Sequence, residues 1–345
     1  MPSPFNLALI GYGFAGRVFH APLIRHTPDL VLHSVVTSRV AEASAALPGT
    51  CVRATAADVL DDPAVEAVVI AAPNDVHASL ALAALQAGKH VMVDKPFALD
   101  ALQAEAVVSV AEANGRVVTV FQNRRFDADF LSLQALLAEG SLGEIAECHV
   151  HFDRFRPQVR DRWREREGPG SGLWYDLGPH LLDQMLVLFG RPQAITLDTD
   201  CQRGTGGVDW FHAVLQYPRM RAVLHAGSLV AATPPAFTVH GSRGSWVKQG
   251  RDAQEAQLAA GHVPGDPGWG VDAQPGVLTR EDGAGGLQVE LRPTVPGDYR
   301  VVYERFAASL RGERLPEVTV DQALLLMRLL DAGQRSAREG RRITV

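Results

Sequence analysis

Residues 7–16 have the sequence Leu-Ala-Leu-Ile-Gly-Tyr-Gly-Phe-Ala-Gly, and this stretch decides the fold of the N-terminal part. The aliphatic residues predict a buried strand, and the glycines that follow match the pattern G-x-G-x-x-G. The first glycine allows a tight turn, the second lets the backbone approach a pyrophosphate, and the third allows close packing of a helix. Free N–H groups at the start of that helix attract phosphates. The pattern predicts a dinucleotide site that contains Gly11, Tyr12, Gly13, Phe14, Ala15 and Gly16.

Short aliphatic runs alternate with helical stretches through the first 122 residues. Strands are expected at residues 7–10, 32–36, within 64–72, 90–93 and 117–121, with helices up to 24, at 76–87 and at 99–114. Pro22 has no N–H to donate, so the first helix should kink or restart there. Aliphatic strands separated by helices predict a parallel sheet covered on both faces. We expect an α/β fold in which residues 1–122 form a doubly wound Rossmann domain.

The rhythm of the sequence changes after residue 123. Helices are expected at 126–139 and 178–189, strands at 144–155, 194–201, 210–217, 222–230 and 237–247, and closing helices at 299–310 and 321–338. Residues 251–298 are rich in glycine, proline and charge, which predicts an insertion or a long loop. Residues 123–345 should form an α+β domain with a mostly antiparallel, open sheet. Val214, Leu224 and Val239 either line an uncovered face or belong to the core, and an uncovered face predicts a homodimer or homotetramer.

The composition argues against several classes of protein. The 345 residues carry a formal net charge of -6, which is unfavourable for binding nucleic acid or an anionic membrane. The three scattered cysteines match neither a disulfide framework nor a structural zinc site. No apolar run reaches the roughly 18 residues of a membrane span, and the N-terminus lacks an export signal. We expect a cytoplasmic protein.

The end of the second strand should distinguish NAD from NADP. An NAD site usually has a carboxylate about 20 residues beyond the glycines, where it binds the ribose 2′-hydroxyl. The sequence here is Thr37-Ser38-Arg39, without an acid. Two hydroxyls and a guanidinium suit a 2′-phosphate, although a polar loop with an exposed arginine has the same appearance. These residues favour NADP over NAD as the cofactor.

Three further segments carry a family resemblance. Pro73-Asn74-Asp-Val-His77 follows the third strand, Asp94-Lys95-Pro96 follows the fourth, and Asp176-Leu-Gly-Pro-His180 lies in the second domain. Together with the glycine loop they resemble the Gfo/Idh/MocA oxidoreductases over nearly the whole chain. Asp94 departs from the family pattern, which has glutamate there, but it keeps a carboxylate. The subgroup that the chain most resembles is that of the NADP-dependent scyllo-inositol dehydrogenases, through residues 11–24, 36–39, 123–126 and 155–164.

The resemblance implies hydride transfer between NADP(H) and a secondary alcohol or ketone of a polyol or sugar, with scyllo-inositol as the best single candidate. Another sugar, a sugar acid or a cyclic ketone is the alternative substrate. A cofactor-binding regulator without turnover is a third interpretation. In the family pattern Lys95, Asp176 and His180 are catalytic. His180 would accept the hydroxyl proton, Lys95 would donate to the substrate oxygen, and Asp176 would orient the histidine or the substrate.

The same resemblance assigns the remaining site residues. Beyond the glycine loop and residues 37–39, those implied for the cofactor are Pro73, Asn74, His77, Asp94, Lys95 and Asn123. Those implied for the substrate are Lys95, Arg154, Trp163, Asp176 and His180. Asp183 and the nearby histidines could suggest a metal site. The Asp176 and His180 pair, however, has no apparent third ligand and hydride transfer needs none, so no metal is expected.

Pro179 bears on the position of His180. Proline is tolerated in the first turn of a helix, so a helix should begin within residues 176–179. His180 would then lie at the positive end of the helix dipole, which favours a neutral imidazole. The alternative is that Asp176 is only an N-cap and His180 only a packed residue.

An arginine-rich stretch precedes this segment. Its six arginines are Arg154, Arg156, Arg160, Arg162, Arg164 and Arg166. A solvated, ion-paired surface or a subunit contact is one explanation. The other is a loop over the active site in which Trp163 and one or two arginines face the substrate. Several converging arginines would favour an acidic or phosphorylated sugar.

Overall fold

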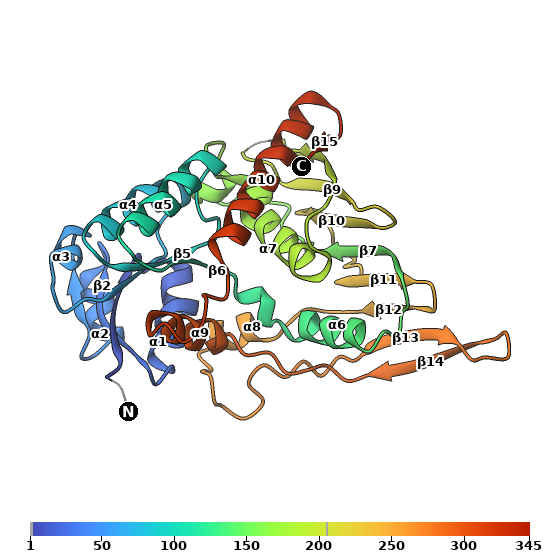
Figure 1. Ribbon diagram of the computed structural model, residues 1–345, viewed down its shortest axis with the longest axis horizontal. Coiled ribbons are helices and arrows are strands. Elements are labelled where there is room, and N and C mark those ends of the chain that lie inside the picture. The colour runs from blue at the N-terminus through green and yellow to red at the C-terminus, as the bar shows by residue number, and fades with distance from the viewer. Residues whose placement is uncertain (1–2, 205) are drawn as a thin grey trace. The chain divides into compact units, whose positions relative to one another are not determined.

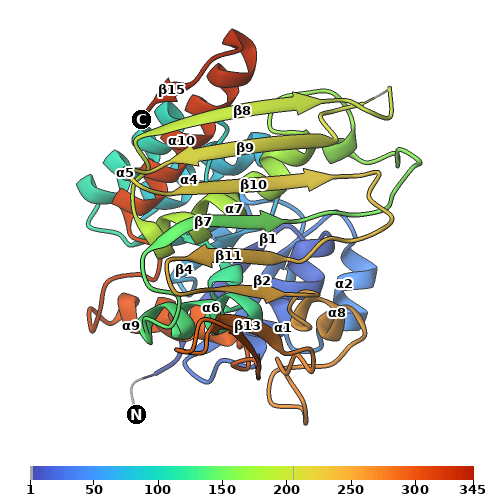
Figure 2. The ribbon, with the colours of Figure 1, turned by 90° about the vertical axis from the view of Figure 1, so that its right-hand side faces the viewer.

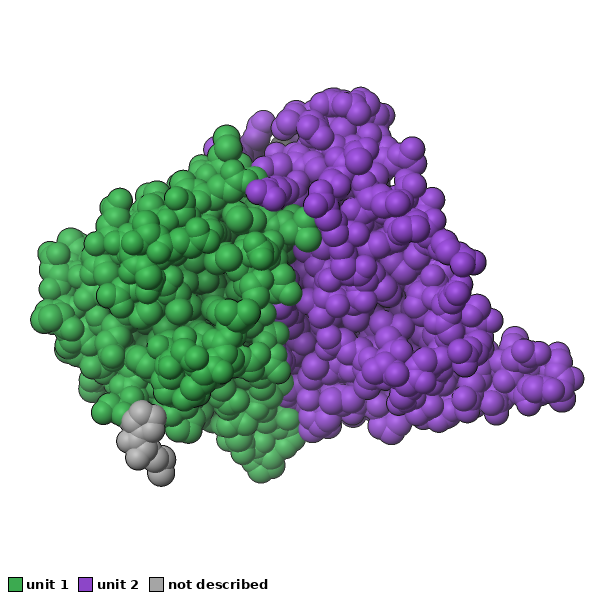
Figure 3. Space-filling model, in the orientation of Figure 1, with its two compact units in different colours: residues 1–123, 254–269, 298–327 green, residues 124–253, 270–297, 328–345 purple. Residues whose placement is uncertain are grey.

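The computed structural model describes residues 3–204 and 206–345, and the chain divides into two compact units (Figure 3). Unit 1 comprises Met1–Asn123, Gln254–Trp269 and Asp298–Met327, and unit 2 comprises Arg124–Ala253, Gly270–Gly297 and Arg328–Val345. The first long stretch of unit 1 thus ends beside the expected boundary at residues 122 and 123. Two later segments, which the sequence analysis assigned to the second domain, also belong to unit 1. Both segments bury side chains, Leu258 in the first and Tyr299 and Tyr303 in the second.

The sheet of unit 1 has the strand order β3-β2-β1-β4-β5-β6, and every neighbouring pair is parallel (Figure 1). Its strands are β1 (Phe5–Ile10), β2 (Leu30–Val36), β3 (Cys51–Arg53), β4 (Ala67–Ile70), β5 (His90–Asp94) and β6 (Val118–Phe121). All four residues of β4 are buried, as expected for a strand covered on both faces. The predicted Rossmann sheet is confirmed. Its strand order reverses between β1 and β4, where ligands bind in such sheets.

Unit 1 also contains helices, most of which connect its strands. They are α2 (Val40–Ala46), α3 (Ala57–Leu60), η2 (Asn74–Val76), α4 (His77–Gln86), α5 (Ala101–Ala113), α8 (Gln254–Ala259) and α9 (Arg300–Leu310). The helix after the glycine loop is a π-helical turn, η1 (Gly16–His20), followed by α1 (Ala21–Arg25) with Pro22 in its first turn. The backbone stays helical from η1 into α1, and the helix changes from π to α type at Ala21, beside Pro22, so the predicted kink or restart stays a prediction. The long helix α10 (Val320–Glu339) is shared between the two units.

The sheet of unit 2 has the order β14-β13-β12-β11-β7-β10-β9-β8-β15. Its strands are β7 (Ile145–His151), β8 (Ala194–Asp200), β9 (Trp210–Gln216), β10 (Arg221–Gly227), β11 (Phe237–Gly241), β12 (Gly244–Lys248), β13 (Gly276–Glu281), β14 (Leu287–Arg292) and β15 (Ile343–Thr344). Strands β7 and β10 pair in parallel and the other neighbours are antiparallel. The helical segments are η3 (Asn123–Phe126), α6 (Ala128–Ala138), η4 (Trp163–Glu165) and α7 (Gly172–Phe189). The predicted α+β domain with a mostly antiparallel sheet is confirmed.

Two expectations for this unit were wrong. Residues 237–247 are not one strand but the hairpin of β11 and β12, which turns at Ser242 and Arg243. Residues 251–298 are not an irregular insertion, since they contain α8 and the β13/β14 hairpin. The glycines that suggested a loop lie in the turns of this segment. Gly283 and Gly285, between β13 and β14, adopt positive φ angles.

One face of the unit 2 sheet packs on helices. In Figure 2 the sheet lies in front of α7, and no helix covers the face that is turned toward the viewer. Trp174 of α7 packs edge-to-face on Phe211 of β9, with ring centroids 5.2 Å apart. Leu224 and Val239 are fully buried, whereas Val214 is half-buried and points to the other face. Only Val214 of the three apolar residues therefore lies on the uncovered face. Assembly into a homodimer or homotetramer stays a prediction.

The length and hydropathy of the helices show whether any of them could span a membrane. Among residues 3–204 and 206–345, no helix combines the length and the apolar character needed to cross a bilayer.

Candidate active site

The glycine loop connects β1 to the π-helical turn η1 at the switch point of the sheet. Gly11 has φ +103°, and a Cβ at this position would lie 2.4 Å from the carbonyl oxygen of Ala71 at the end of β4. A Cβ on Gly16 would lie 2.1 Å from the carbonyl oxygen of Gly11. A Cβ on Gly13 would meet no atom within 4 Å. The fold itself requires the outer two glycines, whereas the middle one leaves open space beside the loop, which fits the approach of a pyrophosphate.

The end of β2 carries the polar group expected from the sequence. The Thr37 hydroxyl accepts a hydrogen bond from the Arg39 N–H at 3.1 Å, and the Arg39 guanidinium donates to the carbonyl oxygen of Tyr12. A cationic side chain thus lies against the glycine loop. Glu42 of α2 approaches both Arg39, at 3.6 Å, and Arg17 of η1, at 3.5 Å. Sequence reasoning missed Arg17 and Glu42, since neither belongs to the segment that ends β2.

His77 ties together the segments that follow β4 and β5. Its Nδ1 lies 2.7 Å from the carbonyl oxygen of Pro96, and its Nε2 lies 2.9 Å from that of Ala72. The ring is buried, as is Asn74 three residues earlier. His77 therefore holds the backbone beside Lys95 to the end of β4. Pro73, Asn74 and Lys95 all follow strands at the carboxyl edge of the sheet, where a dinucleotide binds in this fold.

A buried network supports the residue before Lys95. Asp94 accepts a hydrogen bond from the Lys95 N–H at 2.8 Å, and its other oxygen lies 3.8 Å from Nε2 of His20. Nδ1 of His20 lies 2.6 Å from the Tyr303 hydroxyl. Burial alone would raise the pKa of Asp94, but His20, together with Lys95 and His77, outweighs burial and lowers that pKa to about 2. Asp94 is therefore a fixed carboxylate at neutral pH. His20 and Tyr303 had no local sequence signal, because they are 283 residues apart.

In unit 2, Asp176 and His180 lie on α7. This helix begins at Gly172, after Ser171 as N-cap, and Pro179 lies inside it. The expected start within residues 176–179 was wrong, because a missing proline N–H costs one hydrogen bond and does not by itself end a helix that packing stabilises. His180 is consequently near the middle of the 18-residue helix, and the dipole argument for its neutral form fails. Asp176 is not the N-cap of this helix, so that part of the alternative is wrong.

Asp176 and His180 are one helical turn apart and lie on the same side of α7. His180 is 5% exposed, and the side chain of Asp176 is 17% exposed. Two arginines approach the Asp176 carboxylate, Arg154 at 3.4 Å and Arg164 at 3.9 Å. The Arg164 guanidinium also lies over the Trp163 ring, 5.1 Å from its centroid. The structure therefore brings Arg154, Trp163 and Asp176 together in unit 2.

The two explanations of the arginine-rich stretch apply to different arginines. Arg154 and Arg164 face Asp176 of the candidate site. Arg166 instead pairs with Asp161 at 2.5 Å, with both side chains well exposed. Arg160 and Arg162 are also exposed. Arg160, Arg162 and Arg166 are thus on the surface, whereas Arg154 and Arg164 reach the candidate site.

Arginines missed by the sequence analysis gather around Phe152, just before Arg154. The guanidinium carbons of Arg124, Arg154 and Arg251 lie 4.7, 5.1 and 3.4 Å from the centre of the Phe152 ring. Burial, followed by repulsion from Arg124 and Arg154, lowers the pKa of Arg251 to about 9. Three guanidinium groups around one ring form a region of concentrated positive charge that continues to Asp176 through Arg154.

Asp183, a possible metal ligand by sequence, has another role. Its two carboxylate oxygens accept hydrogen bonds from Nη2 and Nε of Arg125 at 2.6 and 2.8 Å. Both side chains are almost fully buried. This bidentate pair fixes η3 to α7, and Gln184 adds a bond to the Arg124 carbonyl at 3.2 Å. Asp183 therefore positions the helix that carries His180.

Comparison with known proteins shows which family the chain belongs to. Residues 5–122 match the oxidoreductase family with an NAD-binding Rossmann fold, and residues 134–345 match its C-terminal alpha/beta domain. The chain belongs to the Gfo/Idh/MocA oxidoreductase family. Its unit 1 therefore contains the NAD-binding Rossmann fold of this family, and the protein is an oxidoreductase.

Two sequence relatives extend over nearly the whole chain. An uncharacterized oxidoreductase YdgJ of Escherichia coli (strain K12) is 47% identical over 339 residues and covers 98% of each chain. The scyllo-inositol 2-dehydrogenase (NADP(+)) IolW of Bacillus subtilis (strain 168) is 38% identical over 342 residues, 98% of this chain and 95% of the relative. Among solved structures, the putative oxidoreductase yvaA from Bacillus subtilis superimposes with a TM-score of 0.96, at 37% identity and 99% coverage of both chains. In each case the similarity extends over both units of this chain.

Proposed function

We propose that this protein is an NADP-dependent dehydrogenase that oxidises a secondary alcohol of a polyol or sugar, or catalyses the reverse reduction. The best single pair is scyllo-inositol and its keto-inositol. The observation that carries the cofactor assignment is the end of β2, where Arg39 donates to the glycine loop and residues 37–39 contain no carboxylate. The substrate assignment is supported by the 38% identity to the relative named scyllo-inositol 2-dehydrogenase (NADP(+)).

The proposed cofactor residues are those of unit 1. The backbone of residues 11–16 would hold the pyrophosphate, and Thr37, Ser38 and Arg39 the 2′-phosphate. Asn74, His77 and Asp94, with Pro73, Lys95 and Asn123, would complete the set. When bound, the nicotinamide supplies the acceptor or donor of the hydride. Glu42 is the one carboxylate beside Arg39 and Arg17 in the described residues, and a bound 2′-phosphate would compete with it for both cations.

Each proposed catalytic residue has a separate role in the reaction. His180 would take the hydroxyl proton during oxidation and return it during reduction. The Lys95 ammonium would donate a hydrogen bond to the same substrate oxygen and stabilise developing negative charge. Asp176, one turn before His180 and beside Arg154, would orient the imidazole or bind a substrate hydroxyl. In this scheme the protein supplies a base, a hydrogen-bond donor and an orienting carboxylate.

A second candidate function is oxidation or reduction of a sugar acid. The specific observation is the convergence of Arg124, Arg154 and Arg251 on Phe152, together with the contact of Arg154 to Asp176. Guanidinium groups bind carboxylates bidentately, so a substrate carboxylate would gain paired hydrogen bonds there. Neutral polyols would not use this charge.

The proposal is tested by absorbance at 340 nm with NADP or NAD against inositols, aldoses and sugar acids. We expect NADP reduction with scyllo-inositol and little activity with NAD. Arg39→Asp should reverse the cofactor preference, whereas Arg219→Asp, the same charge change at an exposed position of unit 2, should not. Faster turnover of sugar acids would favour the second candidate. Tight NADPH binding without turnover on any of these compounds would contradict both and support a regulator.

A further inference from the structure

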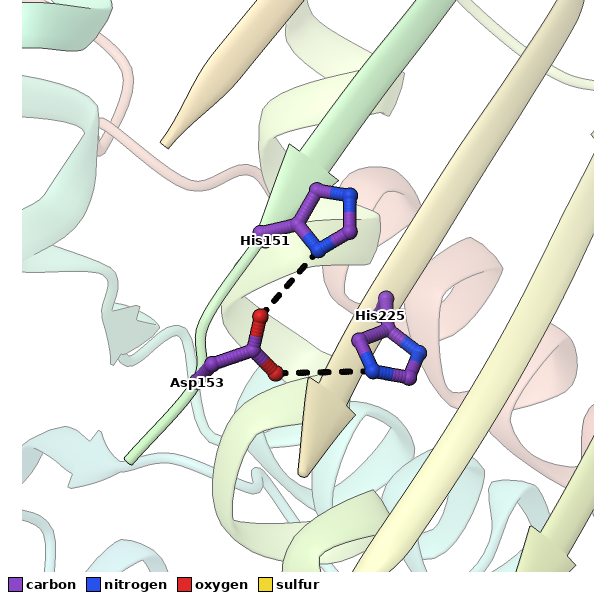
Figure 4. A group of neighbouring side chains, drawn as sticks. All are labelled: His151, Asp153 and His225. Carbon is purple, nitrogen blue, oxygen red and sulfur yellow. Dashed lines mark hydrogen bonds and ion pairs between the residues drawn. The ribbon is translucent and has the colours of Figure 1, made fainter. Parts of the chain in front are cut away.

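The uncovered face of the unit 2 sheet carries a histidine-rich group away from α7. His151 ends β7, His225 lies on β10, and the two residues are register partners in the parallel pair. Asp153 follows two residues after His151, so its side chain points to the same face. The three side chains point toward one another in Figure 4.

The distances between the ligand atoms of the three side chains can be compared with those around a bound zinc ion. One carboxylate oxygen of Asp153 lies 3.1 Å from Nδ1 of His151, and the other lies 3.5 Å from Nε2 of His225. One ligand atom from each residue lies within 4.8 Å of the other two. Ligand atoms about 2.0–2.2 Å from a tetrahedral zinc ion are about 3.3–3.5 Å apart. To enclose an ion, ligand atoms that are up to 4.8 Å apart would have to move to about 3.3–3.5 Å from one another.

The carboxylate is held in place by the sheet. Only 1% of the Asp153 side chain is exposed, and one of its oxygens accepts a hydrogen bond from the Gly227 N–H at 2.8 Å. Backbone bonds from Phe152 to His225 and from Arg154 to Gly227 extend the β7/β10 pairing past Asp153. A metal ligand oriented by a backbone N–H in this way is typical of a preorganised site.

We propose that His151, Asp153 and His225 bind one divalent transition-metal ion, with zinc as the reference ion. Two imidazole nitrogens and one carboxylate oxygen are ligands that zinc prefers, and three protein ligands leave a position for water or another ligand. The ion joins the end of β7 to β10 in the middle of the sheet.

The site is separate from the proposed hydride chemistry. Asp176 and His180 lie on α7, which packs through Trp174 on the opposite face of the sheet, where Phe211 points. The next residue, His212, lies on the metal face, with its ring centroid 5.7 Å from that of His225. The ion therefore stabilises the sheet without contacting the proposed base.

The neighbouring residue His149 supplies a matched control. It lies on the same face of β7, and its ring is stacked on that of His151 with centroids 6.5 Å apart. Its Nε2, however, pairs with Glu147 at 2.8 Å. His149→Gln removes a histidine from the same strand and face without removing a proposed ligand.

The experiment uses the full-length protein, freed of metal by a chelator and then titrated with zinc in a calorimeter. We expect one zinc ion per chain for the wild type and for His149→Gln. Losing an outer partner of a metal ligand costs about 10–100-fold in affinity, so loss of a direct ligand in His225→Gln should cost at least about 100-fold. Titration with cobalt(II) should give the visible absorption of a tetrahedral site in the same two proteins.

Thermal unfolding gives a second readout that does not depend on activity. Zinc should raise the Tm of the wild type and of His149→Gln but not that of His225→Gln, because an ion that binds only the folded state stabilises it. If His225→Gln does not fold, His151→Gln replaces it in the same comparison. Equal zinc affinity in wild type and His225→Gln, or a loss of binding caused by His149→Gln, would overturn the proposal.

Discussion

Alanine substitutions at Gly16 and Gly13 separate what the fold requires from what the cofactor requires. A methyl group on Gly16 would lie 2.1 Å from the carbonyl oxygen of Gly11 and 3.0 Å from its carbonyl carbon. These are backbone atoms, and the Gly11 N–H is bonded to the Val36 carbonyl at 3.0 Å, so they cannot move aside as a flexible side chain would. Overpacking of this kind costs about 1–3 kcal/mol or more. Gly16→Ala should lower the free energy of unfolding by at least that amount.

Gly13→Ala should behave differently. No atom lies within 4 Å of the added methyl group, so the free energy of unfolding should stay the same or rise by about 0.4–1 kcal/mol. The methyl group would nevertheless fill the space that the proposed pyrophosphate approaches. Losing one hydrogen bond to a charged group costs about 1.5–3 kcal/mol, which corresponds to an NADPH Kd weaker by roughly 10–100-fold.

Urea unfolding followed by tryptophan fluorescence measures the first quantity, and titration of NADPH fluorescence measures the second. If Gly16→Ala is as stable as the wild type, the close contact between Gly16 and Gly11 is wrong. If Gly13→Ala binds NADPH with unchanged affinity, the loop does not hold the pyrophosphate as proposed.

Three further substitutions test other parts of the structure. His180→Ala should lower kcat by about 10²–10⁴-fold while NADPH affinity is retained, and a near-normal rate would remove His180 from the mechanism. Arg125→Met should lower the free energy of unfolding in urea by about 3–5 kcal/mol, because Asp183 would remain a buried charge without its partner. A change below about 1 kcal/mol would contradict this. Burial, with repulsion by Asp252, raises the pKa of Asp129 to about 6, so the folded state binds this proton more tightly than the unfolded chain. The free energy of unfolding should therefore fall as pH rises from about 4 to about 6, and Asp129→Asn should remove that fall, which unfolding curves at several pH values would detect.

The fold of unit 1 could be predicted because its signals are local. The central strands are rich in aliphatic residues, β4 wholly so, and the steric needs of Gly11 and Gly16 are visible as glycines in the sequence. The hairpin at residues 237–247 was missed because the two strands flank a turn of only two residues, so they looked like one run. Strand β14 was missed because its apolar residues are exposed, Leu287 by 75%, and show no buried alternation.

The candidate site could be predicted only where its residues follow strands or form a compact segment. Lys95 and His77 belong to the first kind, and Asp176 with His180 to the second. The pairing of Arg125 with Asp183 joins residues 58 positions apart, and the convergence of Arg251 on Phe152 depends on how distant strands lie in one sheet. Such contacts arise from tertiary packing and leave no periodic pattern in the sequence. The start of α7 was misjudged because packing outweighed the local preference of Pro179.

The most direct test of the proposed function follows the hydride itself. The purified protein is incubated with NADP and scyllo-inositol carrying deuterium on every ring carbon, and the reduced cofactor is analysed by mass spectrometry. We predict NADPH that carries one deuterium, with the keto-inositol as the other product, and slower turnover than with the undeuterated substrate. Reduced cofactor without deuterium, or no reduced cofactor from a protein that binds NADPH, would contradict the proposal that this chain transfers a hydride from a polyol carbon to NADP.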